Sequence, residues 1–436
     1  MNARLTTLCC LILLAGALRA EAPLERTLPC GARVAVAGSG ASRIFAVHVL
    51  LRNRSAAEPA GREGLVDLAH RFLGEGSARR SRSEMTLALN AIGAQLKTVD
   101  SPMIPFDDYY SVPDYSWVRF QVIDTYRQEG LRLLAEILFE PRLDAENLQR
   151  ARTALLGVQG RREKDPRAAG QEQLHGLLFA SPWMTRPIYG TRASVGAITL
   201  EDVRAFWPTY FSAANMIWTV STNRPATETM DEVATLLASC RPAGPTSAVA
   251  AAPAAAAAGQ QRTLALKSRQ GYLWAGLAFP VTAADWPALE VLVAMFSEQL
   301  TFELRERQGL AYSLGAGLGA ADGGRLATVT VSMGTRQANL DGATAGIREQ
   351  MDQFTRAEIT PRQLEKTVNR LKGQILMRNF PALNRSYFMA LGMFQGRPPD
   401  YYRQRLDRLG AVSLDDLRRV RQTYFRPDQF AWVRVE

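Results

Sequence analysis

Two stretches of this chain, GAITLEDVRAFWPTYFSAANMIWTVS (Gly196–Ser221) and GAVSLDDLRRVRQTYFRPDQFAWVRV (Gly410–Val435), align at a constant offset of 214 residues. Nine of the 26 aligned positions are identical, among them a Thr-Tyr-Phe triplet and a tryptophan. Each copy begins with Thr or Ser followed by acids, which is typical of a helix N-terminus, and continues as an amphipathic helix and a strand. A repeat of this length predicts a duplicated domain.

The segments before each copy follow the same order in both halves. Strand-like runs are expected at 33–37, 44–51 and 117–123 in the first half and at 263–267, 273–279 and 326–333 in the second. Helices are expected at 64–73, 125–139, 144–164 and 166–179, and again at 286–305, 338–354, 361–377 and 381–394. This mixture predicts an α+β protein of two homologous α/β-sandwich domains, each a sheet with packed helices.

Pro242–Gly259 separates the two halves. The segment has no charged residue, three prolines and mostly alanine, so it buries too little apolar surface to offset its ordering entropy. We therefore predict an N-terminal domain at 21–241, an Ala/Pro-rich linker at 242–261 and a C-terminal domain at 262–436.

The first 20 residues are predicted to be a cleaved signal peptide. Arg4 precedes a 14-residue apolar stretch that is too short to span a bilayer, and Ala20 offers a cleavage site. No other segment has the length of a membrane helix, so we expect a periplasmic protein without an integral membrane segment after processing. An oxidising compartment permits a disulfide between Cys30 and Cys240, and two buried free thiols are the alternative.

The basic charge does not indicate a nucleic-acid partner. The net charge is +10, but only five of the 52 basic residues are lysines, and the arginines are spread over the chain without a basic run. A basic surface still favours acidic substrates or partners through long-range attraction.

The segment Gly64–Ser77, GLVDLAHRFLGEGS, holds the candidate catalytic positions. Asp67, His70 and Arg71 are spaced i, i+3 and i+4, so they share one face of a helix. Taken alone, this pattern indicates a solvated polar face that carries one histidine.

The surrounding residues resemble the pitrilysin/insulinase family of zinc peptidases. The resemblance rests on the Gly-Leu and Gly-Ser that frame this helix, on the Tyr-Gly and Tyr-Phe pattern at 189–211, and on LRERQGLAYS at 304–313. It implies two such domains forming a clam-like half-chamber, and a His-x-x-Glu-His helix that binds zinc and carries the general base.

The family positions hold different residues here. Asp67 and Arg71 stand for the two histidines, His70 for the glutamate, and Val158 for the third ligand, a glutamate about eight residues before an Asp-Pro. Asp67 could still ligate a metal, but an arginine always carries its charge and offers no lone pair. The resemblance therefore implies no catalytic residue and no metal in this chain.

Arg305 and Tyr312 keep the seven-residue spacing of a substrate-binding pair in the family's second domain. A guanidinium and a phenol would donate to a peptide carbonyl or a developing oxyanion. The resemblance implies a non-catalytic subunit that binds peptide beside a homologous partner with an intact His-x-x-Glu-His motif and its zinc. A scaffold or peptide-binding protein without a protease role is the alternative, and an unfamiliar metalloenzyme using Asp67 and His70 is a third possibility.

Overall fold

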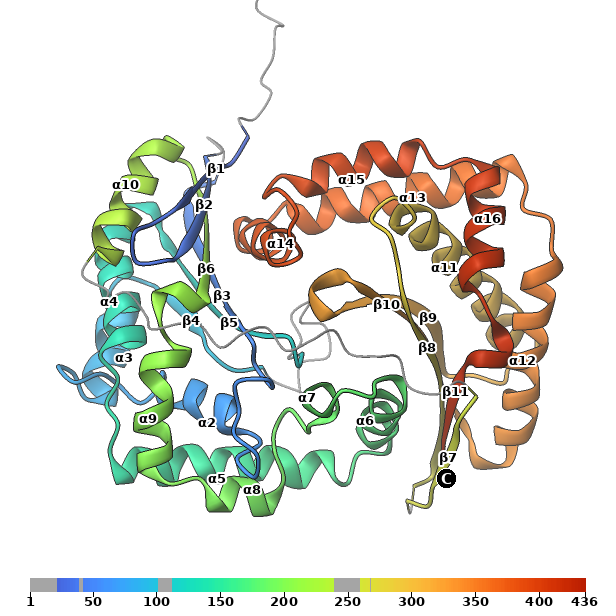
Figure 1. Cartoon of the computed structure of the whole chain (residues 1–436), viewed down its shortest axis with the longest axis horizontal. Coiled ribbons are helices and arrows are strands. Elements are labelled where there is room, and N and C mark those ends of the chain that lie inside the picture. The colour runs from blue at the N-terminus through green and yellow to red at the C-terminus, as the bar shows by residue number, and fades with distance from the viewer. Residues whose placement is uncertain (1–21, 39–41, 101–111, 239–258, 267) are drawn as a thin grey trace, which may run out of the picture.

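A computed structural model describes residues 22–38, 42–100, 112–238, 259–266 and 268–436. Within these residues the chain forms two mixed β-sheets, one from each half of the sequence, with helices packed against both (Figure 1). Most of the linker, the residues before 22, and Cys240 lie outside the described residues. No described helix is both long and apolar enough to cross a membrane.

The first sheet has six strands in the order β1-β2-β6-β3-β5-β4. Its last strand in sequence, β6, runs parallel to β2 and antiparallel to β3, with Trp218 opposite Val34 and Val49. The remaining neighbours pair in antiparallel fashion. The strands are β1 (Leu24–Thr27), β2 (Arg33–Gly38), β3 (Ile44–Arg52), β4 (Gln95–Lys97), β5 (Tyr115–Ile123) and β6 (Met216–Thr222).

The second sheet has five strands in the order β7-β11-β8-β10-β9. The last strand, β11, again has one parallel and one antiparallel neighbour, β7 and β8, with Trp432 opposite Gln261 and Ala275. The strands are β7 (Gln261–Leu264), β8 (Gln270–Pro280), β9 (Ser313–Ala321), β10 (Leu326–Arg336) and β11 (Ala431–Val435).

The two sheets share one topology, which supports the duplication seen in the sequence. Apart from β1, each strand of the first sheet has a counterpart at the same place in the second. The repeated helices α9 (Leu200–Tyr210) and α16 (Leu414–Tyr424) both begin in a capping box, made by Thr199 with Asp202 and by Ser413 with Asp416. The predicted caps are confirmed, and each helix leads into the closing strand of its sheet.

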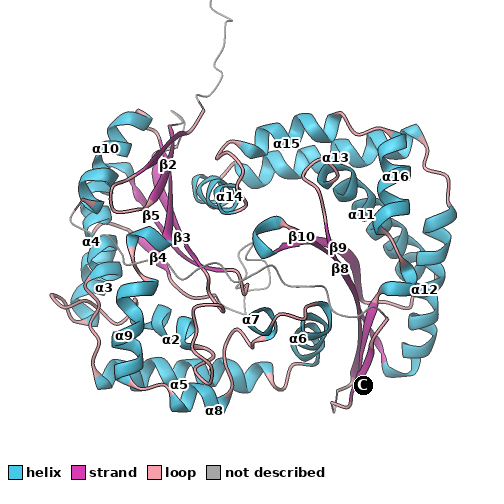
Figure 2. Cartoon of the chain, in the orientation of Figure 1, coloured by secondary structure: helices cyan, strands magenta, loops and turns pink. Residues whose placement is uncertain are grey.

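The other helices lie mainly on one face of the sheet of their own half (Figure 2). Those of the first half are α2 (Leu65–Phe72), α3 (Arg82–Ala91), α4 (Arg127–Phe139), α5 (Ala145–Arg162), α6 (Pro166–Leu178), α7 (Pro182–Thr185), α8 (Arg192–Ala197) and α10 (Ala226–Leu237). Those of the second half are α11 (Trp286–Leu300), α12 (Leu340–Arg356), α13 (Pro361–Asn379), α14 (Ala382–Phe394) and α15 (Tyr401–Gly410). A π-helical segment, η3 (Thr301–Arg307), follows α11, so the helix expected at 286–305 changes its winding near its end.

Two helices are exchanged between the halves. Helix α14 packs on β3 and β6 of the first sheet, where Tyr387 and Met393 join a core with Leu50. Helix α6 packs in the same way on β8 and β11 of the second sheet. At Gly170 of α6, a Cβ atom would lie 2.6 Å from Cδ1 of Trp274, so glycine is required for this close approach. Each sheet is therefore covered on its second face by a helix from the other half.

Candidate functional site

The four positions where this chain departs from the family's zinc-binding pattern, Asp67, His70, Arg71 and Val158, are called the degenerate positions, and the first three lie on helix α2. A buried carboxyl group fixes the start of this helix. Gly64 precedes the helix with φ 91°, a left-handed conformation that favours glycine. The amides of Gly64 and Val66 donate to Oε1 of Glu58 at 3.2 and 2.9 Å. Burial raises the pKa of Glu58 to about 7 in spite of these bonds. The start of α2 is thus fixed by a side chain from the preceding loop.

The polar face of α2 is buried, so its interpretation as a solvated face is wrong. Only 3% of the Asp67 side chain is exposed, and 12% of Arg71. Nε of Arg71 donates to Oδ1 of Asp67 at 2.8 Å, and Nη2 of Arg54, on the loop after β3, lies 3.6 Å from Oδ2. Two guanidinium groups therefore flank one carboxylate. Arg54 gives no signal in the sequence, because it lies 13 residues before Asp67 in an irregular segment.

His70 is locked into a neutral hydrogen-bonded chain. Its Nδ1 donates to the Thr98 carbonyl at 2.8 Å, so Nε2 accepts from the Ser116 hydroxyl at 2.7 Å. The Tyr210 hydroxyl completes the chain by donating to Oγ of Ser116 at 2.7 Å. Burial lowers the pKa of His70 to about 3, and the nearby Arg54 charge acts in the same direction. With both ring nitrogens engaged, His70 has no lone pair available to activate a water.

Val158, at the position of the third ligand, faces the core from α5. The helix packs against α2, and Val158 belongs to the same buried cluster as Leu68 and Ala69. The neighbouring Gln159 is also buried and donates through Nε2 to the Tyr189 carbonyl at 2.7 Å. Val158 thus lies on a helix that packs against α2, but it supplies only an aliphatic side chain.

Arg305 and Tyr312 lie in the second half and point outward. Arg305 belongs to η3 and is 50% exposed, and its only ion pair within the described residues is with the adjacent Glu306 at 3.6 Å. Tyr312 is 85% exposed, and its backbone amide donates to the Gly334 carbonyl just before β9 begins. In the described part of the chain, no hydrogen bond or ion pair joins these two side chains to the α2 positions.

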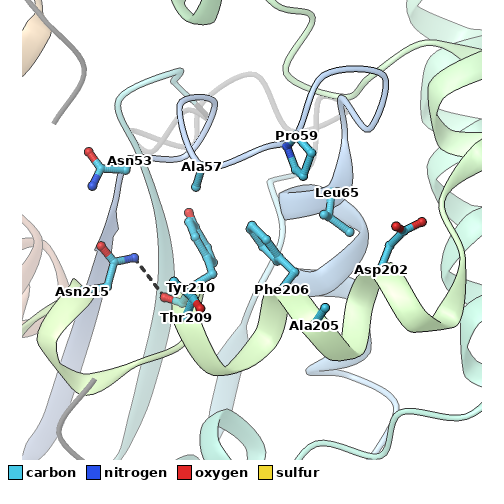
Figure 3. A pocket seen from close by; sticks show the side chains of 10 residues that line it. All are labelled: Asn53, Ala57, Pro59, Leu65, Asp202, Ala205, Phe206, Thr209, Tyr210 and Asn215. Carbon is cyan, nitrogen blue, oxygen red and sulfur yellow. Dashed lines mark hydrogen bonds between the residues drawn. The ribbon is translucent and has the colours of Figure 1, made fainter. Parts of the chain in front are cut away.

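A cavity of about 290 Å³ lies beside α2 (Figure 3). The stacked rings of Phe206 and Tyr210, 4.9 Å apart between centroids, form one wall. The lining residues are Asn53, Ala57, Pro59, Leu65, Asp202, Ala205, Phe206, Thr209, Tyr210 and Asn215. None of the degenerate positions lines it, so the cavity is separate from the polar face of the helix.

Comparisons with known proteins support the fold and the resemblance to zinc peptidases. A family model described as the peptidase M16 inactive domain matches residues 197–371. An uncharacterized zinc protease of Streptomyces coelicolor is 21% identical over 362 residues, 80% of this chain and 76% of that protein. A probable mitochondrial-processing peptidase subunit beta of Arabidopsis thaliana is 23% identical over 191 residues, 44% of this chain and 34% of that protein. The crystal structure of a peptidase M16 inactive domain from Pseudomonas fluorescens superposes with a TM-score of 0.85 at 17% identity, over 95% of this chain and 98% of that one.

These matches support the predicted resemblance to the pitrilysin, or M16, family of peptidases, although the family model covers less than half of the chain. The segment matched by the M16 model includes Arg305 and Tyr312 but begins after α2. The predicted fold of two α/β domains is confirmed by the two sheets and by the M16 structure.

The residues at the predicted metal positions do not fit zinc. Both oxygens of Asp67 face guanidinium groups, and Arg54 and Arg71 bring positive charge to the place of a cation. Val158 adds no donor atom. Among the residues that the structure describes, no group of three or more His, Cys, Asp or Glu side chains is arranged to hold a metal. The metal chemistry of the M16 family therefore has no support in the α2 region of this chain.

Proposed function

We propose that this chain is the non-catalytic, substrate-binding subunit of a heterodimeric periplasmic zinc metalloprotease that acts on peptides. The observation that carries the proposal is the contrast between the two sites. On α2, Asp67 is buried in ion pairs with Arg54 and Arg71, whereas Arg305 and Tyr312 are largely exposed and can donate to an external group. Export is inferred from the N-terminal sequence, with its short apolar stretch after Arg4.

In this proposal, two clam-like subunits enclose a chamber that admits unfolded peptides. The partner is a homologous M16 chain with an intact His-x-x-Glu-His helix, and it supplies the zinc and the general base. Arg305 and Tyr312 face that zinc and donate to the peptide backbone or to the oxyanion that forms during hydrolysis. One similar protein is by its name a subunit of a mitochondrial-processing peptidase, which supports a paired arrangement.

Co-expression with such a homologue tests the proposal. We expect a stable complex with peptidase activity, and we expect Arg305→Ala and Tyr312→Phe each to lower kcat/KM by about a hundredfold, the usual effect of losing one oxyanion donor. Arg307→Ala is the matched control, because Arg307 lies in the same π-helical segment and pairs with Glu303.

Unchanged activity in both variants would refute the role of the pair. Failure of a pull-down to recover a zinc-peptidase homologue, together with unchanged peptidase activity after deletion of the gene, would favour a scaffold or peptide-binding protein instead. Stoichiometric zinc in the purified single chain would contradict the non-catalytic assignment.

A further inference from the structure

The ion pairs on α2 leave a surplus of buried donors. Asp67 accepts from Nε of Arg71 and lies 3.6 Å from Nη2 of Arg54, and 3% of the Arg54 side chain is exposed. Nε and Nη1 of Arg54 and Nη2 of Arg71 are buried and have no hydrogen-bond partner among the residues that the structure describes. A guanidinium has five N–H donors and no acceptor, so each of these N–H groups needs an acceptor oxygen, and an anionic oxygen suits the charge best.

Buried charged donors without acceptors are unfavourable, since water no longer solvates them. One carboxylate serves two guanidinium groups here, so the polar face of α2 carries an excess of positive charge. The structure also shows which acceptor suits the pair, because Asp67 is itself a carboxylate placed between Arg54 and Arg71. Charge-assisted bonds from arginine to carboxylate are among the strongest hydrogen bonds in proteins.

The surrounding groups do not remove this excess. Arg162 lies over the Tyr189 ring at 4.9 Å, on a ring that Arg54 also approaches, and Arg186 donates to the Glu58 carbonyl at 2.6 Å. Further acids among the described residues are Asp100, near Tyr189, and Glu58, near Arg54. Because burial raises the pKa of Glu58 to about 7, this carboxyl group is only partly ionised near neutral pH. Within the described residues, Asp67 is therefore the one carboxylate that pairs with both Arg54 and Arg71.

We propose that Arg54 and Arg71 form a carboxylate-binding site at the place where M16 peptidases bind zinc, and that its ligand is a carboxylate of a peptide. In this proposal the site binds an organic anion, whereas the corresponding site of M16 peptidases binds a metal cation. Arg71 is more exposed than Arg54, so a peptide carboxylate contacts Arg71 first. Arg71 then donates both to this carboxylate and to Asp67. That the carboxylate belongs to a peptide rests on the function proposed above; the anion site rests on the charges themselves.

Peptide binding to the purified chain without its partner tests this site. Three fluorescent peptides of one sequence serve as probes. The first has a free C-terminus and no acidic side chain, the second is its C-terminal amide, and the third is the amide with one internal glutamate. We expect the free acid or the glutamate peptide, or both, to bind at least about tenfold more tightly than the plain amide at low salt. The peptide that gains affinity identifies the source of the carboxylate.

Two substitutions at the site change the affinity in opposite directions. Arg71→Gln should abolish the preference for a carboxylate, whereas Asp67→Asn should strengthen it several-fold, because the competing internal carboxylate is gone. A gain of affinity cannot result from misfolding, so the second variant keeps the test valid if the first is unstable. Arg62→Gln is the charge-matched control, because Arg62 pairs with Asp202 on the wall of the cavity, away from Asp67.

Equal affinity for acid and amide peptides overturns the proposal, as does a loss in Arg62→Gln as large as that in Arg71→Gln, which would indicate general electrostatic attraction. Neither result bears on the proposal that the chain is a subunit of a protease. That proposal is tested separately by the activity of the complex with Arg305 and Tyr312 variants.

Discussion

Helix α2 and the segment from Arg305 to Tyr312 both hold residues that resemble functional positions of M16 peptidases. The two regions differ in how far these side chains are buried and paired. On α2, the polar side chains are buried and bound to one another, with Asp67 between Arg54 and Arg71 and His70 between Thr98 and Ser116. In the other segment the side chains are exposed and make few contacts. Burying a polar group costs free energy unless it finds a hydrogen-bond partner, whereas exposed polar groups cost little and remain available. The first region is buried and largely paired within the chain, and the second is an exposed surface.

The largest expected effect is on stability, when the shared carboxylate of α2 is removed. Asp67→Ala leaves Arg54 and Arg71 as buried charges without their partner, so the free energy of unfolding should fall by about 3–5 kcal/mol. Urea denaturation measures this value. Asp67→Asn is the control, because it keeps the shape and one acceptor oxygen and should cost clearly less. A loss below 1 kcal/mol for Asp67→Ala would mean that the ion pairs do not support the core.

A second test uses the pH dependence of stability. The pKa of His70 is lowered to about 3 by burial, while an unfolded histidine titrates near 6.5. Below pH 6.5 the unfolded chain therefore binds a proton that the folded chain does not, and the free energy of unfolding falls as the pH drops from 6.5 toward 3. The contribution is at most about 1.4 kcal/mol per pH unit, or about 2 kcal/mol between pH 6.5 and 4.5.

Urea denaturation of the wild-type chain and of His70→Gln at pH 7.5 and pH 4.5 checks this expectation. The wild type should lose about 2 kcal/mol more than the variant on acidification. Other groups with shifted pKa values, such as His48 and Glu58, are present in both chains and cancel in the difference. Equal losses would show that His70 is not held in its neutral form.

A third test restores the residues of the family's zinc site on α2 and α5. The variant with Asp67→His, His70→Glu, Arg71→His and Val158→Glu supplies the ligands and the base, but Arg54 stays beside the site and repels a cation. We therefore expect weak zinc binding that improves at least about tenfold when Arg54→Met is added. Competition with a fluorescent zinc chelator gives the affinities, and Arg62→Met is the control substitution. Tight binding with Arg54 in place would show that this arginine does not oppose the metal.

The sequence predicted the duplication well, because the repeated segment has local signals of its own. Thr199 and Ser413 are good N-caps, each followed three residues later by an aspartate, and the structure has a capping box at both. A strand was expected to begin near Tyr312, but the extent of β9 was not predicted, because its sequence, SLGAGLGAA, lacks the β-branched and aromatic residues typical of strands. It becomes a strand through its pairing with β10.

The exchange of α6 and α14 between the halves was also beyond sequence analysis. Their amphipathic patterns predict helices but not the sheet that each one covers, which is settled by tertiary packing. The same limit applies to the α2 site. Spacing placed Asp67, His70 and Arg71 on one face, but the partners Arg54, Thr98 and Ser116 come from the loop after β3, the residue following β4 and strand β5.

The smallest expected effect belongs to the exposed segment, and it completes the comparison. Tyr312 is 85% exposed and Arg305 is half exposed with one weak ion pair, so Tyr312→Phe and Arg305→Ala should change the free energy of unfolding by less than about 0.5 kcal/mol. The measurement is the same urea denaturation that is used for Asp67→Ala. A loss above 1 kcal/mol would mean that these side chains stabilise the fold, which would explain their presence without any peptide. If stability is unchanged while activity of the complex falls, the pair serves binding and not folding.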